Sequence, residues 1–123
     1  MIRFHYYYNY IKKLYFSYLY RRPGHEEQIY RLAEHISSKI DPTHRTIICG
    51  DFNINYRKKP ANIISAQLRE LGFTQIVTEP TTIKGSCLDH VYIGGNLEAI
   101  HKLHYPYYSD HEAIRVVVRK KLI

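Results

Sequence analysis

The chain has 123 residues, of which 45% are hydrophobic and 24% are charged, so its size and composition are those of one globular domain. Lys and Arg number 18 against 11 Asp and Glu, and residues 1–60 carry 11 of the basic and 5 of the acidic side chains. No apolar run approaches the roughly 20 residues that span a bilayer, and two cysteines exclude a disulfide framework, so we expect an intracellular protein with no membrane partner.

The basic N-terminal half, which contains many of the 13 tyrosines, leaves two interpretations open. A positive surface with interleaved aromatic side chains suits a polyanion such as nucleic acid. The same charge is typical of a solvated face that keeps a protein soluble, and charge alone does not choose between them.

The first half of the chain predicts a strand, a helix and a second strand. Residues 12–22 are aromatic and β-prone, which predicts a strand that ends before Pro23. Residues 46–52, TIICGDF, form a short apolar run typical of a central strand buried on both faces. Between them, residues 25–40 place apolar side chains at the spacing of a helix, namely Ile29, Leu32, Ala33, Ile36 and Ile40.

The second half predicts one more helix and four more strands. The helix is expected to open at Pro60 and stop at Gly72, with an apolar stripe of Ile63, Ile64, Leu68 and Leu71. Strands are expected over residues 73–79, 87–95, 97–105 and 112–122, with loops over 80–86 and 106–111. The order β-α-β-α-β-β-β-β indicates an α/β or α+β layer. We expect one domain over residues 13–123 and leave the Tyr-rich residues 1–12 unplaced.

Three predicted strands end, or are interrupted, at polar groups. Asp51 and Asn53 follow a buried strand, and side chains two apart on a strand point to one side, so both can face one ligand. Asp89 interrupts an apolar strand, so it must be paired, hydrogen-bonded or placed at the end of the strand. Asp110 and His111 stand just before the last strand.

These side chains are of the types that phosphodiester hydrolysis requires. The reaction needs a hard divalent cation held by carboxylates, which polarises the phosphoryl oxygen. It also needs a positioned base for water and a donor that stabilises charge on the phosphorane oxygens. An imidazole oriented by a carboxylate is such a donor.

Each residue also has a purely structural interpretation, which stays open at this point. Asp51 and Asn53 favour turns and can cap one, and Asp110 can do the same in its loop. His111 taken alone is typical of a structural histidine. The functional interpretation rests on three polar groups that share one chemistry.

Three segments in this order resemble a known family: ICGDFNIN, then GFTQIVTEPTTIKGSCLDHVYI, then YYSDHEAIRVVV. They resemble the C-terminal half of the endonuclease/exonuclease/phosphatase superfamily, which has the DNase I-like fold. The residues between the motifs most resemble the endonuclease domains of LINE-type and Helitron-type mobile elements. The resemblance covers about residues 13–120.

The resemblance implies catalytic roles for four of the residues above. Asp51 matches the family's acid that orients or deprotonates the attacking water, and Asn53 the amide that contacts the scissile phosphate. Asp89 matches the carboxylate that orients the catalytic histidine. His111 matches that histidine, which contacts the phosphate and stabilises the transition state.

The resemblance also implies a metal site and a further phosphate contact. Asp110 matches an acid near the metal, which with Asp51 would hold Mg²⁺ or Mn²⁺. Tyr20 resembles the tyrosine of a Y-x-P-like motif whose hydroxyl contacts the phosphate, although Arg21 and Arg22 separate it from Pro23.

The chain departs from the family in its first half. Family domains are about twice as long and consist of two sheets packed face to face with helices outside. Their first half carries a Glu that is the main Mg²⁺ ligand, and in this sequence no Asp or Glu precedes Glu26. We therefore expect an α/β (α+β) sandwich of DNase I-like type, of which this chain supplies about one sheet with flanking helices. The inter-sheet face is then expected to lack its partner, which predicts self-association, and metal affinity is expected to be poor.

The resemblance predicts a Mg²⁺-dependent DNA endonuclease of mobile-element type, truncated to its C-terminal half and nuclear in location. One alternative is a catalytically inactive, basic nucleic-acid-binding remnant. Another is a phosphatase or phosphodiesterase of the same superfamily that acts on a non-nucleic substrate. DNA is the expected partner, together with a missing N-terminal half or a second copy bound through the inter-sheet face.

Two basic clusters have a functional and a structural interpretation. Arg21 and Arg22 adjoin Tyr20, and Arg57, Lys58 and Lys59 follow the GDFNINY segment. In the functional interpretation they contact the nucleic-acid backbone beside the site. In the structural one they are solvated loop residues.

Overall fold

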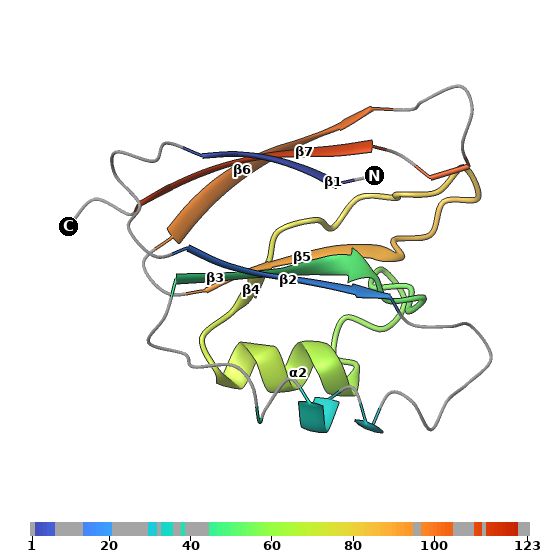
Figure 1. The fold of residues 1–123 in the computed structure, drawn as a ribbon. Coiled ribbons are helices and arrows are strands. Elements are labelled where there is room, and N and C mark those ends of the chain that lie inside the picture. The colour runs from blue at the N-terminus through green and yellow to red at the C-terminus, as the bar shows by residue number, and fades with distance from the viewer. Residues whose placement is uncertain are drawn as a thin grey trace.

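The computed structural model describes residues 2–6, 14–20, 30–31, 33–35, 38, 45–94, 97–104, 110–111 and 113–120. Within these ranges the strands form two sheets that lie face to face (Figure 1). The three-stranded sheet has the order β1-β7-β6, formed by β1 (Ile2–Tyr6), β7 (Ala113–Lys120) and β6 (Leu97–His104). The four-stranded sheet has the order β2-β3-β5-β4, formed by β2 (Leu14–Tyr20), β3 (Arg45–Asp51), β5 (Asp89–Ile93) and β4 (Thr74–Gln75).

Both sheets are mixed. β1 runs parallel to β7, and β2 runs parallel to β3. The remaining pairs, β3–β5, β4–β5 and β6–β7, are antiparallel. Each strand predicted from the sequence is present, with β4 reduced to two residues. β1 lies in the segment that the sequence left unplaced, and it pairs with β7 from Ile2 opposite Ile114 to Tyr6 opposite Val118.

The expectation that the chain supplies about one sheet is wrong, because the described strands form two sheets. Alternation along β7 buries Ile114, Val116 and Val118 against Ile47 and other residues of the four-stranded sheet. The core between the sheets also includes Cys49, Val77, Cys87, Val91, Ile93 and Leu97. The inter-sheet face is therefore covered within this chain, and the predicted self-association through that face loses its basis. The sequence pattern shows which side of a strand is apolar, but not which sheet the strand joins.

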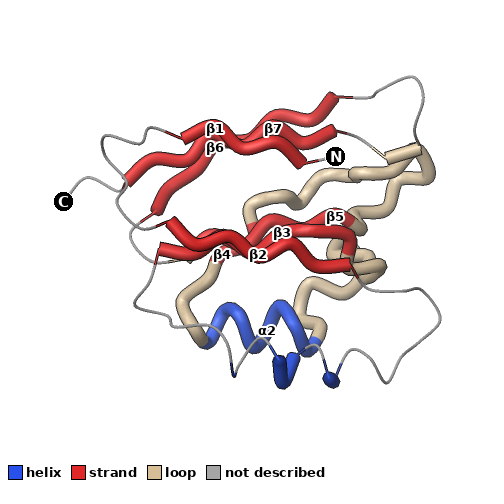
Figure 2. The backbone as a smooth tube through the Cα atoms, viewed as in Figure 1, coloured by secondary structure: helices blue, strands red, loops and turns tan. Residues whose placement is uncertain are grey.

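A second core lies between the four-stranded sheet and the helical layer (Figure 2). Helix α2 (Ile63–Glu70) buries Ile64 and Leu68 against Ile48, Phe52 and Tyr92. The predicted start at Pro60 is wrong, because the side chain of Asn62 caps the helix by accepting a hydrogen bond from the Ser65 amide at 2.9 Å.

The rest of the helical prediction is mixed. Ile63, expected in the apolar stripe, is 42% exposed. Gly72 follows the helix with a φ of +90°, a left-handed conformation that suits glycine and ends a helix, as predicted. In the earlier helix, predicted over residues 25–40, the described residues 30–31, 33–35 and 38 are all helical and Ala33 is buried; the others lie outside the described residues.

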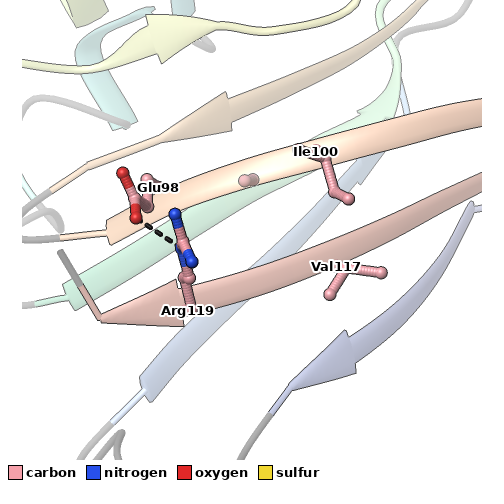
Figure 3. A pocket seen from close by; sticks show the side chains of 5 residues that line it. Glu98, Ile100, Val117 and Arg119 are labelled. Atoms are coloured by element: carbon pink, nitrogen blue, oxygen red, sulfur yellow. Dashed lines mark ion pairs between the residues drawn. The ribbon is translucent and has the colours of Figure 1, made fainter.

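The helical layer lies on the outer side of the four-stranded sheet, while no described element covers the outer side of the β1-β7-β6 sheet (Figure 1). Figure 3 shows that outer side, where Glu98 of β6 forms an ion pair with Arg119 of β7 beside Ile100 and Val117. Ile100 is 72% exposed there. Among the described residues, no helix is both long and apolar enough to cross a membrane.

The two cysteines are buried free thiols, as the sequence predicted. Burial raises the pKa of Cys49 to about 12, and burial together with the nearby carboxylates of Asp89 and Glu79 raises that of Cys87 to about 12. Both thiols therefore stay protonated at neutral pH and act as small apolar side chains.

Candidate functional site

Three residues singled out in the sequence lie in one row across the four-stranded sheet. In the register of the strands, Tyr20 of β2 pairs with Asp51 of β3, and Asp51 pairs with Asp89 of β5. Because β3 and β5 are antiparallel, the end of β3 and the start of β5 meet at the same edge of the sheet. Asp51 and Asp89 are therefore direct cross-strand neighbours, with their side chains on one face.

That face is the one turned toward the other sheet. Asp89 alternates with Val91 and Ile93, and Asp51 alternates with Cys49, and these apolar neighbours belong to the core between the sheets. Asp89 is 6% exposed, and Asp51 is half-buried. The two acids thus lie where the inter-sheet core opens at the edge of the sandwich.

His111 reaches this edge from the other sheet, because it stands two residues before β7. It is held there by an isolated antiparallel bridge to Thr82 and by the amide of Ile83, which donates to the carbonyl of Asp110 at 3.0 Å. Its Nδ1 donates to Oδ2 of Asp89 at 2.7 Å. The pair joins the two sheets through a charged hydrogen bond.

The surroundings of His111 favour its protonated form. Partial burial lowers the pKa of His111, but the hydrogen bond that the ring donates to Asp89 and the negative charges of Asp89, Asp51 and Asp110 outweigh burial, so the pKa lies above its ordinary value. The imidazole is thereby oriented, and its protonated form persists to a higher pH than that of an ordinary histidine.

Asn53 is held by Asp51, though not in the way that strand alternation predicts. The strand ends at Asp51, and the amide of Asn53 donates to Oδ1 of Asp51 at 3.0 Å, as in an Asx turn. Asn53 has a φ of 51°, a left-handed conformation that Asn tolerates better than most residues. Asn53 lies beyond the end of β3 in a turn, so the alternation of side chains along a strand, from which the sequence placed it beside Asp51, does not apply.

The donor set at this edge fits a hard divalent cation. Ligand atoms of Asp51, Asp89 and His111 all lie within 4.8 Å of one another. Two carboxylates directly opposite each other repel unless a positive charge lies between or beside them, and Mg²⁺ is commonly held by one or two carboxylates plus waters. Asp110, predicted as a metal ligand with Asp51, is exposed and outside this group of three, although its charge acts on His111.

The loop over residues 80–86, for which the sequence predicted no functional role, supports Asp89. Thr81 is fully buried, and its Oγ1 accepts hydrogen bonds from the amides of Leu88 and Asp89 at 3.0 and 3.1 Å. Thr82 binds Ser86 and bridges to His111. The only sequence signal for these roles was the pair of threonines between Pro80 and Cys87, which also fits an ordinary turn.

The predicted phosphate-contacting basic residues are described only in part. Arg57, Lys58 and Lys59 are exposed on a turn, and Nη1 of Arg57 donates to the carbonyl of Gly85 at 3.2 Å. This contact ties the basic turn to the loop that carries Thr82. The side chain of Tyr20, and Arg21 and Arg22 entirely, lie outside the described residues.

Comparison with known proteins gives one family and one solved relative. The family model described as the endonuclease/exonuclease/phosphatase family matches residues 2–111. Among solved structures, the chain is similar to CdtB, the biologically active subunit of cytolethal distending toxin, with a TM-score of 0.54 and 19% sequence identity. No curated protein sequence matches the chain.

The structural match covers 90% of this chain and 49% of that chain, so the chain spans about half the length of this solved relative. At this identity the likeness shows the fold, and it confirms the DNase I-like class that the motifs predicted. The family match covers nearly the whole chain, including β1 and all three motifs up to His111. The chain belongs to the endonuclease/exonuclease/phosphatase family.

Proposed function

We propose that the chain carries the C-terminal half of a metal-dependent phosphodiesterase site. We further propose that its substrate is DNA and that it is an endonuclease of mobile-element type. The observation that carries the proposal is the 2.7 Å pair of His111 and Asp89 beside Asp51 at one edge of the sandwich. Membership of the endonuclease/exonuclease/phosphatase family supports phosphodiester chemistry at that edge.

In this proposal the side chains of the site take distinct roles in the reaction. Asp51 orients the attacking water and accepts its proton. Asp89 holds the imidazole of His111, whose raised pKa favours a protonated ring that donates to a phosphate oxygen as negative charge develops. Asn53 donates from its amide, and Tyr20 from its hydroxyl, to other phosphate oxygens.

Mg²⁺ or Mn²⁺, when bound, would supply a Lewis acid that offsets charge on the phosphate. Asp51 and Asp110 are the proposed ligands on this chain, with Asp89 within reach of the same site. The family's glutamate ligand has no counterpart before Glu26 in this sequence, so we propose that the residues present here hold the metal only weakly.

The DNA assignment rests on charge. The net charge is +7, and Arg57, Lys58 and Lys59 are exposed on a turn that is tied to the loop beside His111. Basic side chains there can follow a nucleic-acid backbone and place one phosphate at the site. A nuclear location follows if the chain serves a mobile element.

A second candidate function is a catalytically inactive, basic nucleic-acid-binding remnant. It is favoured by the match to 49% of the length of CdtB and by the lack of an acid before Glu26. A third candidate is a phosphatase or phosphodiesterase for a non-nucleic substrate. It shares the chemistry of the first candidate and differs only in that the basic turn would not bind a nucleic-acid backbone.

The deciding experiment is nicking of supercoiled plasmid in Mg²⁺ against EDTA, with the wild type beside His111→Ala and the control His101→Ala. His101 lies on β6, outside the three-residue site, and its Nε2 is 2.8 Å from Oε1 of Glu79. Nicking that needs Mg²⁺, and that His111→Ala but not His101→Ala abolishes, supports the enzyme. Salt-sensitive DNA binding without nicking supports the remnant, and hydrolysis of a small phosphodiester without DNA binding supports the third candidate.

A further inference from the structure

His90 follows Asp89 in β5 and points to the opposite side of the sheet, toward the helical layer. Its side chain is fully buried, and its Nε2 lies 2.8 Å from the carbonyl oxygen of Ile54 and 3.1 Å from that of Cys87. A carbonyl oxygen only accepts hydrogen bonds. Nε2 therefore carries the proton and donates to both carbonyls.

The two carbonyls belong to the two segments that carry the acids of the site. Ile54 lies in the segment that leaves β3 after Asp51, and Cys87 lies in the segment that enters β5 at Asp89. The segments are also joined by two backbone hydrogen bonds, from Phe52 to Leu88 at 2.9 Å and from Tyr56 to Cys87 at 3.0 Å. The imidazole of His90 thus spans the joint between them.

The imidazole of His90 is held by stacking on an aromatic ring as well as by its hydrogen bonds. It stacks on Phe52 with a centroid distance of 4.9 Å and an interplanar angle of 13°. Phe52 stands between Asp51 and Asn53, so the His90 ring packs against the central residue of the turn in which the Asn53 amide donates to Asp51. Stacked rings of this kind contribute beyond their buried area.

The other ring nitrogen of His90 connects to helix α2. Nδ1 lies 3.3 Å from the hydroxyl of Tyr92, which contacts the hydroxyl of Ser65, and Nδ2 of Asn62 donates to Ser65 Oγ at 3.0 Å. Because the carbonyls place the proton on Nε2, Nδ1 is an acceptor, so Tyr92 donates to Nδ1 and in turn accepts from Ser65. The hydroxyl chain thus satisfies the tautomer that the two carbonyls require.

We propose that His90 is a positioning residue of the site, which clamps the segments that follow Asp51 and precede Asp89 through its Nε2–H, while the Asn62–Ser65–Tyr92 relay from the N-terminus of α2 supplies a donor to its Nδ1. The clamp itself follows from contacts in this chain, while its consequence for phosphodiester cleavage rests on the proposed function. It assigns a role to a buried histidine on the side of β5 away from the reacting groups.

The first test measures amide hydrogen exchange in His90→Phe, which keeps a stacked ring and removes both the Nε2–H donor and the Nδ1 acceptor. Exchange at Phe52, Tyr56 and Cys87 should rise about tenfold, the effect of losing one buried hydrogen bond, while amides of β6 and β7 stay unchanged. His90→Gln, whose amide can donate to a carbonyl, should restore part of the protection, and the control His101→Phe should change none of these amides. An equal rise at all amides, or no rise at the three, would overturn the clamp.

The second test reads the tautomer directly and does not depend on how well a His90 variant folds. The ¹⁵N spectrum of the wild type should show a protonated Nε2 and an unprotonated Nδ1 for His90. Tyr92→Phe should shift the Nδ1 signal by removing its donor, and Ser65→Ala should shift it less. A protonated Nδ1 in the wild type would rule out the relay.

The third test concerns catalysis. If the wild type nicks plasmid, His90→Phe should slow nicking at least tenfold and His90→Gln should recover part of the rate; equal rates would remove the positioning role. If the wild type does not nick at all, the proposed function fails, and the exchange and ¹⁵N results still decide whether the clamp exists.

Discussion

His111 Nδ1 and Asp89 Oδ2 lie 2.7 Å apart and join the two sheets of the sandwich at one edge. The histidine comes from the segment before β7 and the acid from the first residue of β5. Neither strand carries the pair alone, so the geometry of the site depends on how the two sheets pack.

The first prediction concerns the pKa of His111. Asp89→Asn removes the charge and weakens the hydrogen bond that, with other acids, keeps this pKa above its ordinary value, so the pKa should fall. An NMR titration of the ring signals measures the change. The matched control is Glu79→Gln, which alters the carboxylate partner of His101 instead. An unchanged pKa of His111 in Asp89→Asn would contradict the pairing.

The same pair predicts a pH dependence of stability. The pKa of His111 is raised in the folded state, so its contribution is fully present below the ordinary value of 6.5 and is lost as the pH rises through the folded value. Urea unfolding of the wild type and Asp89→Asn should therefore show a difference in the free energy of unfolding that shrinks above that pH. A difference that grows with pH would mean that the sign is wrong.

The second prediction concerns cation binding. Asp51 and Asp89 are direct cross-strand neighbours, and the described part of the chain brings two carboxylates and one imidazole together. We expect weak Mg²⁺ binding by this chain alone, with a dissociation constant on the order of millimolar. Calorimetric titration should show that Asp51→Asn abolishes saturable binding and that Glu79→Gln leaves it intact. Micromolar binding that depends on Asp51 would show that this chain needs no further ligand.

The third prediction concerns the turn at Asn53, which has a φ of 51°. Asn53→Ala should lower the free energy of unfolding by about 1 kcal/mol, because the left-handed conformation is unfavourable for Ala. Asn53→Gly should be at least as stable as the wild type, because glycine adopts this conformation freely. Urea unfolding compares the three. If Asn53→Gly retains stability but loses nicking, the amide of Asn53 acts on substrate and not on folding.

The fourth prediction tests the packing of the two sheets with neighbouring residues of β7. Val116 is fully buried in the inter-sheet core, while Val117 points to the outer side beside Ile100. Val116→Ala should lower the free energy of unfolding by about 2 kcal/mol, and Val117→Ala should change it by less than about 0.5 kcal/mol. Equal effects would mean that the β1-β7-β6 sheet does not pack on its partner as described.

The strands and the chemical character of the site were predictable from local pattern. The apolar run that ends at Asp51 and the one that Asp89 opens both read as buried strands, and both are buried. His111 was also a candidate from its place beside Asp110 before the last strand, and the motif resemblance supplied its role. The structure brings Asp51, Asp89 and His111 together, while their catalytic roles remain the proposal made above.

The remaining features of the fold and the site could not be predicted, because most of them depend on contacts between distant segments. β1 is short, and only its partner β7 identifies it as a strand of the sandwich. Thr81 accepts from the backbone of β5 across a loop, and His90 donates to carbonyls from two segments, and neither contact leaves a periodic signal in the sequence. The turn at Asn53 overrode the alternation that a continued strand would have had.

The parallel pairing of β1 with β7 has a consequence for how the protein is made. Ile2 pairs with Ile114, so the two strands that must meet are separated by almost the entire sequence. Such long-range pairing costs loop-closure entropy and slows folding. During synthesis β1 leaves the ribosome long before β7 is translated, so the three-stranded sheet can form only after β7 has emerged. A chaperone that protects the N-terminal strand during this interval should raise the yield of folded protein.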